Sequence, residues 1–233
     1  MIDFSDMGLT ERMKPQAVKL LRHCDAIDRW FVWTGKRWRM DDDQARFLVA
    51  KAMITALQND IELIVDDDER KEAFKRLNGR RSIRQLAALL STLASEEGIS
   101  TRAPQWDSDP LALMTPDGVV DLKTATIRPA TPTDLMHRCT GVAPMTGTPE
   151  RWIQFIDEIT CGRKDLAEYI RRAIGMTLCG VQRDQVLFLC NGIGSNGKSK
   201  LIETLVEALG DYACVAMPNL LSARTNDAHP TEL

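Results

Sequence analysis

A glycine-rich run near the end of the sequence has the residue types of a phosphate-binding loop. Residues 192–199 read Gly-Ile-Gly-Ser-Asn-Gly-Lys-Ser and match the pattern G-x-x-x-x-G-K-[ST]. Glycines let successive backbone N–H groups converge on an anion at a helix N-terminus without Cβ clashes. Lys198 adds a positive charge for the β- and γ-phosphates, and the hydroxyl of Ser199 is a ligand for Mg²⁺. The run therefore predicts a site for ATP and Mg²⁺.

Seven of the eight loop residues have a predicted role. Lys198 and Ser199 are the predicted catalytic residues, with Ser199 as the metal ligand. The same run also contains G-x-G-x-x-G, but a dinucleotide site requires an acid about twenty positions on, after the next strand. Asp211 precedes the next apolar run instead, so this alternative is disfavoured. The predicted nucleotide contacts are Gly192, Gly194, Ser195, Asn196, Gly197, Lys198 and Ser199.

The acidic half of an ATPase site is not evident in the sequence. P-loop ATPases hold Mg²⁺ and orient water with carboxylates on a neighbouring strand. None of the acids after Ser199 follows an apolar strand, and we expect such a strand to follow Leu233 in a longer protein. Whether the chain by itself is an enzyme is therefore left open. These acids are Glu203, Glu207, Asp211, Asp227 and Glu232.

The segments around the loop predict the start of a P-loop domain. The apolar run Gln185–Cys190 is typical of a strand buried on both faces, with Cys190 as inert packing. A helix through Leu201, Leu205 and Leu209 follows and ends at Gly210. Two more helices are predicted upstream, at 150–160 and 166–179. The linker-like residues 144–149 place a domain boundary, which gives domains 1–148 and 149–233.

The first domain is predicted to be mostly helical with small β-hairpins. A helix runs through Lys19–Leu21, and aromatic runs around Thr34–Lys36 predict a hairpin at 29–40. Three-residue and four-residue apolar spacing predicts two helices, one capped by Asp43 and one capped by Ser82. The helix capped by Ser82 has Ile83 on its apolar face and is predicted to end at Gly98. A third helix is predicted to begin at the acidic residues 66–69 and to end at Asn78-Gly79. A second hairpin joins 119–122 to 126–128. The fold class is α/β.

Composition sets limits on the kind of protein. A net charge of −3 and a pI near 5.7 exclude a uniformly basic nucleic-acid coat. No apolar run of about 18 residues and no signal-peptide core is present, so we expect no membrane segment. Three histidines and no C-x-x-C pair disfavour zinc and disulfides and indicate reduced thiols in the cytoplasm. The cysteines are Cys24, Cys139, Cys161, Cys179, Cys190 and Cys214.

Basic residues at 70–84 are candidates for contacts with DNA. Lys and Arg there outnumber acids, and each phosphate contact would release counterions. The alternative, a solvated helix face with i,i+4 ion pairs, is common and is favoured. The predicted DNA contacts are Arg76, Arg80, Arg81 and Arg84.

Two other groups of residues have a chemical and a structural interpretation. Trp30, Trp33 and Trp38 lie among basic residues and could stack on bases, but hairpin aromatics more often pack in a core. Four aspartates in Pro- and Gly-rich surroundings could bind a metal, although turn capping is favoured. These are Asp107, Asp109, Asp117 and Asp121.

Several motifs together resemble the superfamily-three helicases of phage and plasmid primase-helicases, which are related to the poxvirus primase-helicase. The loop is followed by Leu-Gly-Asp-Tyr-Ala at 209–213, and residues 117–124 look like the hairpin of that family's N-terminal region. Trp152 with Phe155-Ile156 and the run 169–180 resemble its helical lead-in to the ATPase core. Ala125 stands where the family's hairpin often has glycine. No primase catalytic module is evident.

The resemblance implies an AAA+-like ATPase that assembles into a hexameric ring and unwinds DNA. The expected function is that of an ATP-dependent helicase component in phage, plasmid or prophage replication, in the cytoplasm of a bacterial host cell. By position, Lys198 and Ser199 correspond to the nucleotide and Mg²⁺ residues. Two alternatives remain: a non-enzymatic DNA-binding or assembly fragment, and a small P-loop kinase, which the long stretch ahead of the loop disfavours.

Overall fold

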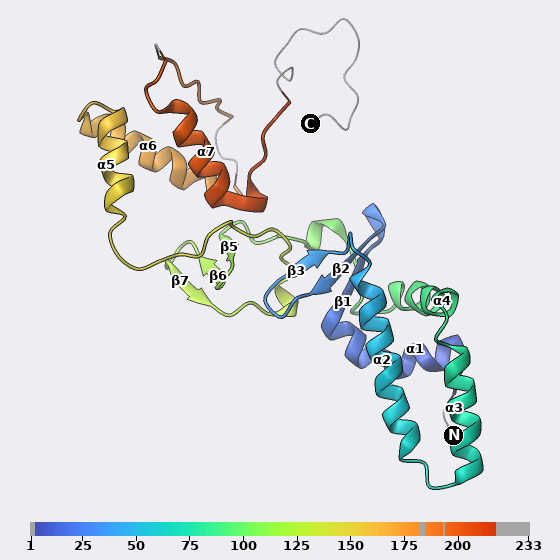
Figure 1. Cartoon of the computed structure of the whole chain (residues 1–233). Helices are drawn as coiled ribbons and strands as arrows, with labels where there is room; N and C mark the ends of the chain where they lie inside the picture. The colour runs from blue at the N-terminus through green and yellow to red at the C-terminus, as the bar shows by residue number, and fades with distance from the viewer. Residues whose placement is uncertain (1–2, 182–184, 193, 218–233) are drawn as a thin grey trace, which may run out of the picture. The chain divides into compact units, whose positions relative to one another are not determined.

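The chain forms two compact units in a computed structural model that describes residues 3–181, 185–192 and 194–217 (Figure 1). The first unit contains Met1–Ser108 and Ala130–His137, and the second contains Asp109–Pro129 and Arg138–Leu233. Regular structure is mixed α/β and predominantly helical, which confirms the predicted class at this level. The boundary at 148/149 stays a prediction.

Four helices make up most of the first unit: α1 (Asp6–Leu20), α2 (Ala45–Glu62), α3 (Asp67–Gly79) and α4 (Ile83–Ala94). The predicted cap Ser82 is confirmed, because its side chain accepts the N–H group of Gln85 at 3.3 Å. The predicted helix start at 66–69 is also confirmed, and Asp66 caps it by accepting the Glu69 N–H at 2.7 Å. The predicted cap Asp43 is wrong by one position. Gln44 is the N-cap in a left-handed conformation, and Asp43 accepts the Ala45 N–H from one residue earlier.

The first unit also has a four-stranded sheet in the order β3-β2-β1-β4. The predicted hairpin is confirmed as β2 (Arg29–Trp33) and β3 (Trp38–Met40). Sequence reasoning missed β1 (Leu21–Cys24), which follows α1 directly, and the two-residue β4 (Ser100–Thr101). Leu21 therefore begins a strand and does not continue the helix. β1 pairs antiparallel with β2 and parallel with β4.

Side chains from α1, α2, α3, α4 and the sheet bury one apolar core. The predicted face of α4 is confirmed at Leu86, Leu90 and Leu93, but Ile83 is 62% exposed and α4 ends at Ala94, before the predicted stop at Gly98. The main cluster is Phe4, Leu9, Met13, Ala17, Leu21, Val32, Ala50, Met53, Ile54, Leu57, Ile61, Ala73, Leu77, Leu86, Leu89, Leu90, Leu93 and Ile99.

The aromatic residues of the first hairpin belong to the interior. Trp38 is fully buried, and its indole N–H donates to the Pro132 carbonyl at 2.9 Å. Phe31 stacks on Trp106 with ring centroids 4.1 Å apart. Trp33 is half-buried and packs edge-on against Trp38. The core interpretation is therefore confirmed for Trp38, and Trp30 packs against the main cluster.

The second unit contains a three-stranded antiparallel sheet: β5 (Ala112–Thr115), β6 (Gly118–Asp121) and β7 (Thr126–Arg128). The predicted hairpin is confirmed as β6–β7, and β5 was missed. Gly118 has φ +140° and a Cβ there would overlap the Arg128 carbonyl, so the β5–β6 turn requires glycine. Ala125 has φ +55°, which explains why a glycine suits this position.

The described part of the second unit also contains three α-helices, α5 (Glu150–Ile159), α6 (Lys164–Thr177) and α7 (Lys198–Leu209). All three confirm predicted helices within a few residues. No helix in the described ranges is long and apolar enough to span a membrane.

The predicted strand at 185–190 is wrong. Residues 185–192 have no regular structure, and Leu187 and Leu189 are 70% and 81% exposed. A strand needs a neighbouring chain to pair with its N–H and C=O groups, and the described part of the molecule places no strand beside this run. Cys190 is consequently exposed and is not the buried packing residue that was expected.

Candidate functional site

The glycine-rich loop adopts a left-handed backbone before α7. Gly194, Ser195 and Gly197 have φ values of +89°, +47° and +82°, and Gly197 is the N-cap of α7. Ile193 lies outside the described residues. Successive N–H groups in such conformations form a concave surface for anions. α7 begins without a side-chain cap, so the N–H groups of its first turn have no side chain as acceptor.

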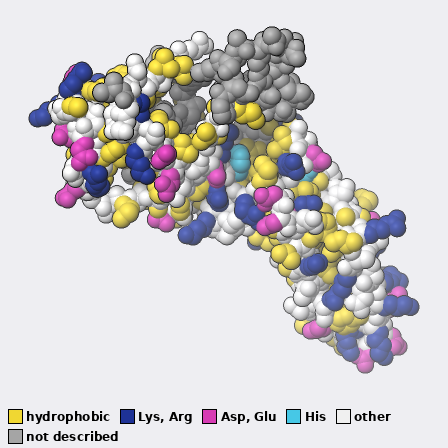
Figure 2. All heavy atoms as spheres, turned by 45° about the horizontal axis from the view of Figure 1, so that its top comes forward, with side chains coloured by type: hydrophobic (Ala, Val, Ile, Leu, Met, Phe, Trp, Pro, Cys, Tyr) yellow, Lys and Arg dark blue, Asp and Glu magenta, His cyan; other side chains and the backbone are white. Residues whose placement is uncertain are grey.

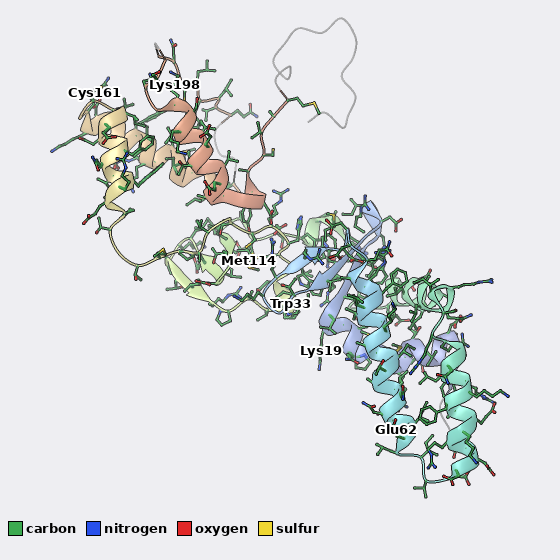
Figure 3. All side chains as sticks on the ribbon, in the orientation of Figure 1. Lys19, Trp33, Glu62, Met114, Cys161 and Lys198 are labelled. Atoms are coloured by element: carbon green, nitrogen blue, oxygen red, sulfur yellow. The ribbon has the colours of Figure 1, made fainter. Side chains whose placement is uncertain are left out.

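Lys198 lies across this loop. Its Nζ donates to the Asn196 Oδ1 at 2.6 Å and to the Gly192 carbonyl at 3.3 Å. Figure 3 labels Lys198 at the start of α7. The first turn of α7 also contains Ser199 and Lys200 and has no acid. The positive charge of the Lys198 ammonium and that of the α7 N-terminus thus coincide at one place, which favours a bound anion.

Helix α5 sets the position of the loop within the second unit. A Cβ at Gly197 would overlap the Ile159 Cγ2 and would lie 3.3 Å from the Phe155 ring. A Cβ at Gly192 would overlap the Asn196 side chain and lie 3.2 Å from the Lys198 Nζ. These two glycines therefore allow α5 and the lysine to approach the backbone closely.

A cleft of about 590 Å³ lies along α7 beside the loop. Lys198 and Ser199 are the loop residues in its wall, and Glu203 and Glu207 are its acids. The Ser199 hydroxyl is the one predicted metal ligand here. The described ranges contain no cluster of three His, Cys, Asp or Glu side chains that would hold a metal ion without a substrate. The lining residues are Cys190, Lys198, Ser199, Ile202, Glu203, Val206, Glu207 and Val215.

The far end of α7 is fixed by residues 208–212, which we call the C-terminal anchor of α7. The Asp211 N–H donates to the Cys139 carbonyl at 2.9 Å, and the Cys139 N–H donates to the Asp211 Oδ2 at 3.2 Å. The Tyr212 hydroxyl accepts the Met114 N–H of β5 at 3.1 Å. α7 therefore runs from Lys198 toward the small sheet that carries Met114 (Figure 3).

Two glycines make the anchor possible. The Gly141 N–H donates to the Ala208 carbonyl at 3.0 Å, and a Cβ at Gly141 would overlap the Glu207 carbonyl. Gly210 has φ +55°, and a Cβ there would lie 2.5 Å from the Gly141 N. Sequence reasoning used 209–213 only as a family signature and missed this role. The sequence signal for this anchor is Gly210, which ends the helix and is followed directly by Asp211 and Tyr212, whose polar groups make the anchoring hydrogen bonds.

The predicted DNA-contacting arginines lie in the first unit, whereas the loop lies in the second. Arg76 pairs with Glu72 at 3.0 Å, and Arg80 pairs with Asp6 at 2.5 Å. Arg81 donates to the amide oxygen of Gln58. Arg76 and Arg80 therefore have carboxylate partners, whereas Arg81 has a neutral amide partner. The Arg84 side chain is exposed.

Two of the four aspartates accept backbone N–H groups in turns, as favoured from the sequence, whereas Asp107 bonds to a distant residue. Asp109 accepts the Leu111 N–H at 3.0 Å, and Asp107 accepts the His137 N–H at 3.1 Å and pairs with the His137 ring. Asp121 accepts the N–H groups of Lys123 at 2.7 Å and Thr124 at 3.3 Å, and these bonds lower the pKa of its carboxyl.

Comparison with known proteins gives two matches. A family model described as "D5 N terminal like" matches residues 8–161. A protein described as putative helicase L207/L206, from Acanthamoeba polyphaga mimivirus, is 24% identical over 216 residues, which cover 83% of this chain and 22% of the relative. The chain spans about a fifth of that relative's length. The matched family region ends before the glycine-rich loop at 192–199.

Proposed function

The chain belongs to the D5 N terminal like family, and we propose on this premise that it is the nucleotide-binding component of a DNA helicase. A helicase- or primase-related role is supported by the family and by the description of the mimivirus relative as a putative helicase. ATP, Mg²⁺, DNA and a hexameric ring belong to the proposal. The proposal also includes an AAA+-like P-loop fold and a role in phage, plasmid or prophage replication in a bacterial cytoplasm.

The observation that carries the proposal is the left-handed loop that ends in Gly197 at the uncapped start of α7. The backbone N–H groups from Gly194 to Lys198 would hold the β-phosphate. The Lys198 ammonium would exchange the Asn196 and Gly192 oxygens for β- and γ-phosphate oxygens.

Bound Mg²⁺ would neutralise negative charge on the triphosphate. The Ser199 hydroxyl is the side chain of this chain that would hold it, as the first side chain after the lysine in α7. The C-terminal anchor of α7 connects this helix to residues 139–141 and to β5. A shift of α7 on nucleotide binding would therefore reach the small sheet through hydrogen bonds.

Isothermal titration of the chain with Mg·ATP tests the proposal. We expect Lys198→Ala to weaken binding by at least about tenfold, because it removes the charge nearest the terminal phosphates. Lys200→Ala is the matched control: it removes a lysine from the same helical turn, and the Lys200 Nζ lies 3.8 Å from Glu203. Equal binding by wild type and Lys198→Ala, or equal weakening by both substitutions, would contradict the assignment.

A further inference from the structure

Basic side chains around α3 and α4 differ in what they bond to. Arg70, Arg76 and Arg80 each pair with a carboxylate, from Asp67, Glu72 and Asp6 respectively. In contrast, Arg81 bonds to the neutral amide of Gln58. Lys51 of α2 is exposed, and in the described ranges no carboxylate lies within ion-pair distance of Lys51, Arg81 or Arg84. Their positive charge is therefore not compensated locally.

Lys51 and Arg81 share a concave site. A cleft of about 280 Å³ lies between α2 and α4, and both side chains line it. Its apolar floor is formed by Ile54 and Leu86, which are buried, and Thr55 supplies a hydroxyl oxygen. The lining contains no acid. Lys and Arg side chains are numerous over this helical end of the first unit, at the lower right of Figure 2, with acidic side chains between them.

The chemistry of the cleft selects a polyanion. Uncompensated cations at a concave, low-dielectric wall focus positive potential and attract anions, although the whole chain carries a net charge of −3. The lining has no aromatic side chain on which a base would stack. Contacts to phosphate position a nucleic acid without reading its sequence.

We propose that the cleft between α2 and α4 binds the phosphodiester backbone of DNA through Lys51 and Arg81, with the exposed Arg84 as a further contact. This inference rests on the proposed function for its partner, DNA, and assigns that partner a site in the first unit. It narrows the four arginines predicted from sequence to Arg81 and Arg84, and it adds Lys51.

Fluorescence anisotropy of the whole chain with labelled oligonucleotides tests the proposal. Single-stranded and duplex oligonucleotides of mixed sequence are titrated between about 50 and 200 mM salt, because affinity that depends on phosphate contacts falls steeply over this range. We expect Lys51→Gln and Arg81→Gln each to weaken binding roughly three- to tenfold. Each is also expected to reduce the slope of log affinity against log salt by about one. The oligonucleotide that binds more tightly identifies the preferred form of DNA.

Lys19→Gln is the matched control, because Lys19 is an exposed lysine at the end of α1 and does not line the cleft. We expect it to leave affinity and salt slope within about a factor of two of wild type. Equal weakening by all three substitutions would mean that only net charge matters and would overturn the proposal. Absence of binding to either oligonucleotide, or wild-type binding by both cleft variants, would also overturn it.

Two further measurements separate folding and nucleotide effects from this result. Circular dichroism checks that each variant is folded. Lys51→Gln breaks no side-chain hydrogen bond in the described structure, so it decides the outcome if Arg81→Gln unfolds. Absence of Mg·ATP binding by the wild-type chain, together with intact cleft-dependent DNA binding, would contradict the proposed function and leave this site standing.

Discussion

The first unit and the loop region of the second unit differ in how their apolar residues are used. In the first unit, helices and sheet bury a common core in which Leu77 and Leu93 are fully inaccessible. In the second unit, α5 and α6 contain no buried residue, and the run before the loop exposes Leu187 and Leu189. The comparison teaches that an apolar pattern becomes a packed element only where its partners are present.

Helix α7 is intermediate between these two regions in how much apolar surface it buries. It forms as predicted and is held at its start by α5 and at its end by the anchor to residues 139–141. Within α7 only Leu201 is buried. Its position therefore depends on backbone hydrogen bonds and close glycine contacts more than on apolar burial, unlike the helices of the first unit.

The largest effect is expected in the core of the first unit. Leu93→Ala removes a fully buried side chain and should lower the free energy of unfolding by about 2–5 kcal/mol. Leu187→Ala, at a residue that is 70% exposed, should change it by less than about 0.5 kcal/mol. Urea denaturation followed by far-UV circular dichroism measures both. Similar decreases in the free energy of unfolding for the two variants would contradict the difference in packing between the two regions.

An intermediate effect is expected at the anchor of α7. Gly210→Ala places a Cβ 2.5 Å from the Gly141 N at a positive φ, and should destabilise the second unit by about 1–3 kcal/mol. Gly79→Ala is the control, because nothing lies within 4 Å of its Cβ and it ends a helix. Hydrogen exchange of the 139–141 amides reports the loss. Unchanged protection of these amides in Gly210→Ala would show that the anchor does not depend on this glycine.

A smaller effect of opposite sign is expected in the β6–β7 turn. Ala125 has φ +55°, which costs an alanine about 1–2 kcal/mol, whereas glycine loses about 0.5–1 kcal/mol in chain entropy. Ala125→Gly should therefore raise stability by about 0.5 kcal/mol, seen as a higher Tm. Ala88→Gly within α4 should lower it by about 1 kcal/mol. A lower Tm for Ala125→Gly would contradict the turn geometry.

The smallest effect concerns the pH response of the same turn. Backbone N–H bonds from Lys123, and then Thr124, lower the pKa of the Asp121 carboxyl. A lowered pKa in the folded state means that this carboxylate stabilises the fold above its unfolded pKa of about 3.9. That contribution is lost as the pH falls through the folded pKa. A carbon-detected NMR titration should place the Asp121 midpoint below 3.9, and a midpoint at or above it would contradict the bonding.

Local signals predicted much of this fold. Caps such as Asp66 and Ser82 act within one helical turn, so sequence alone located the starts of α3 and α4. The Thr34–Lys36 turn and the 123–125 turn located both hairpins. Each of these features depends on neighbours only a few residues away.

Features that depend on distant partners were missed or wrong. β1 and β4 pair although 75 residues separate His23–Cys24 from Ser100–Thr101 along the chain, and no local pattern indicates that pairing. The 185–190 run had the composition of a buried strand without a strand to pair with. For the loop, the residue pattern predicted the start of α7, but it did not indicate the α5 contact or the C-terminal anchor of α7.

The most direct test of the central claim is hydrogen exchange of the whole chain with and without Mg·ATP. We expect slower exchange for the backbone amides of residues 194–199, which would hold the phosphates, and smaller protection at 139–141 through the C-terminal anchor of α7. In Lys198→Ala the protection should disappear at the same ATP concentration. Unchanged exchange at 194–199 in the wild-type chain at millimolar Mg·ATP would contradict the claim that this loop binds nucleotide.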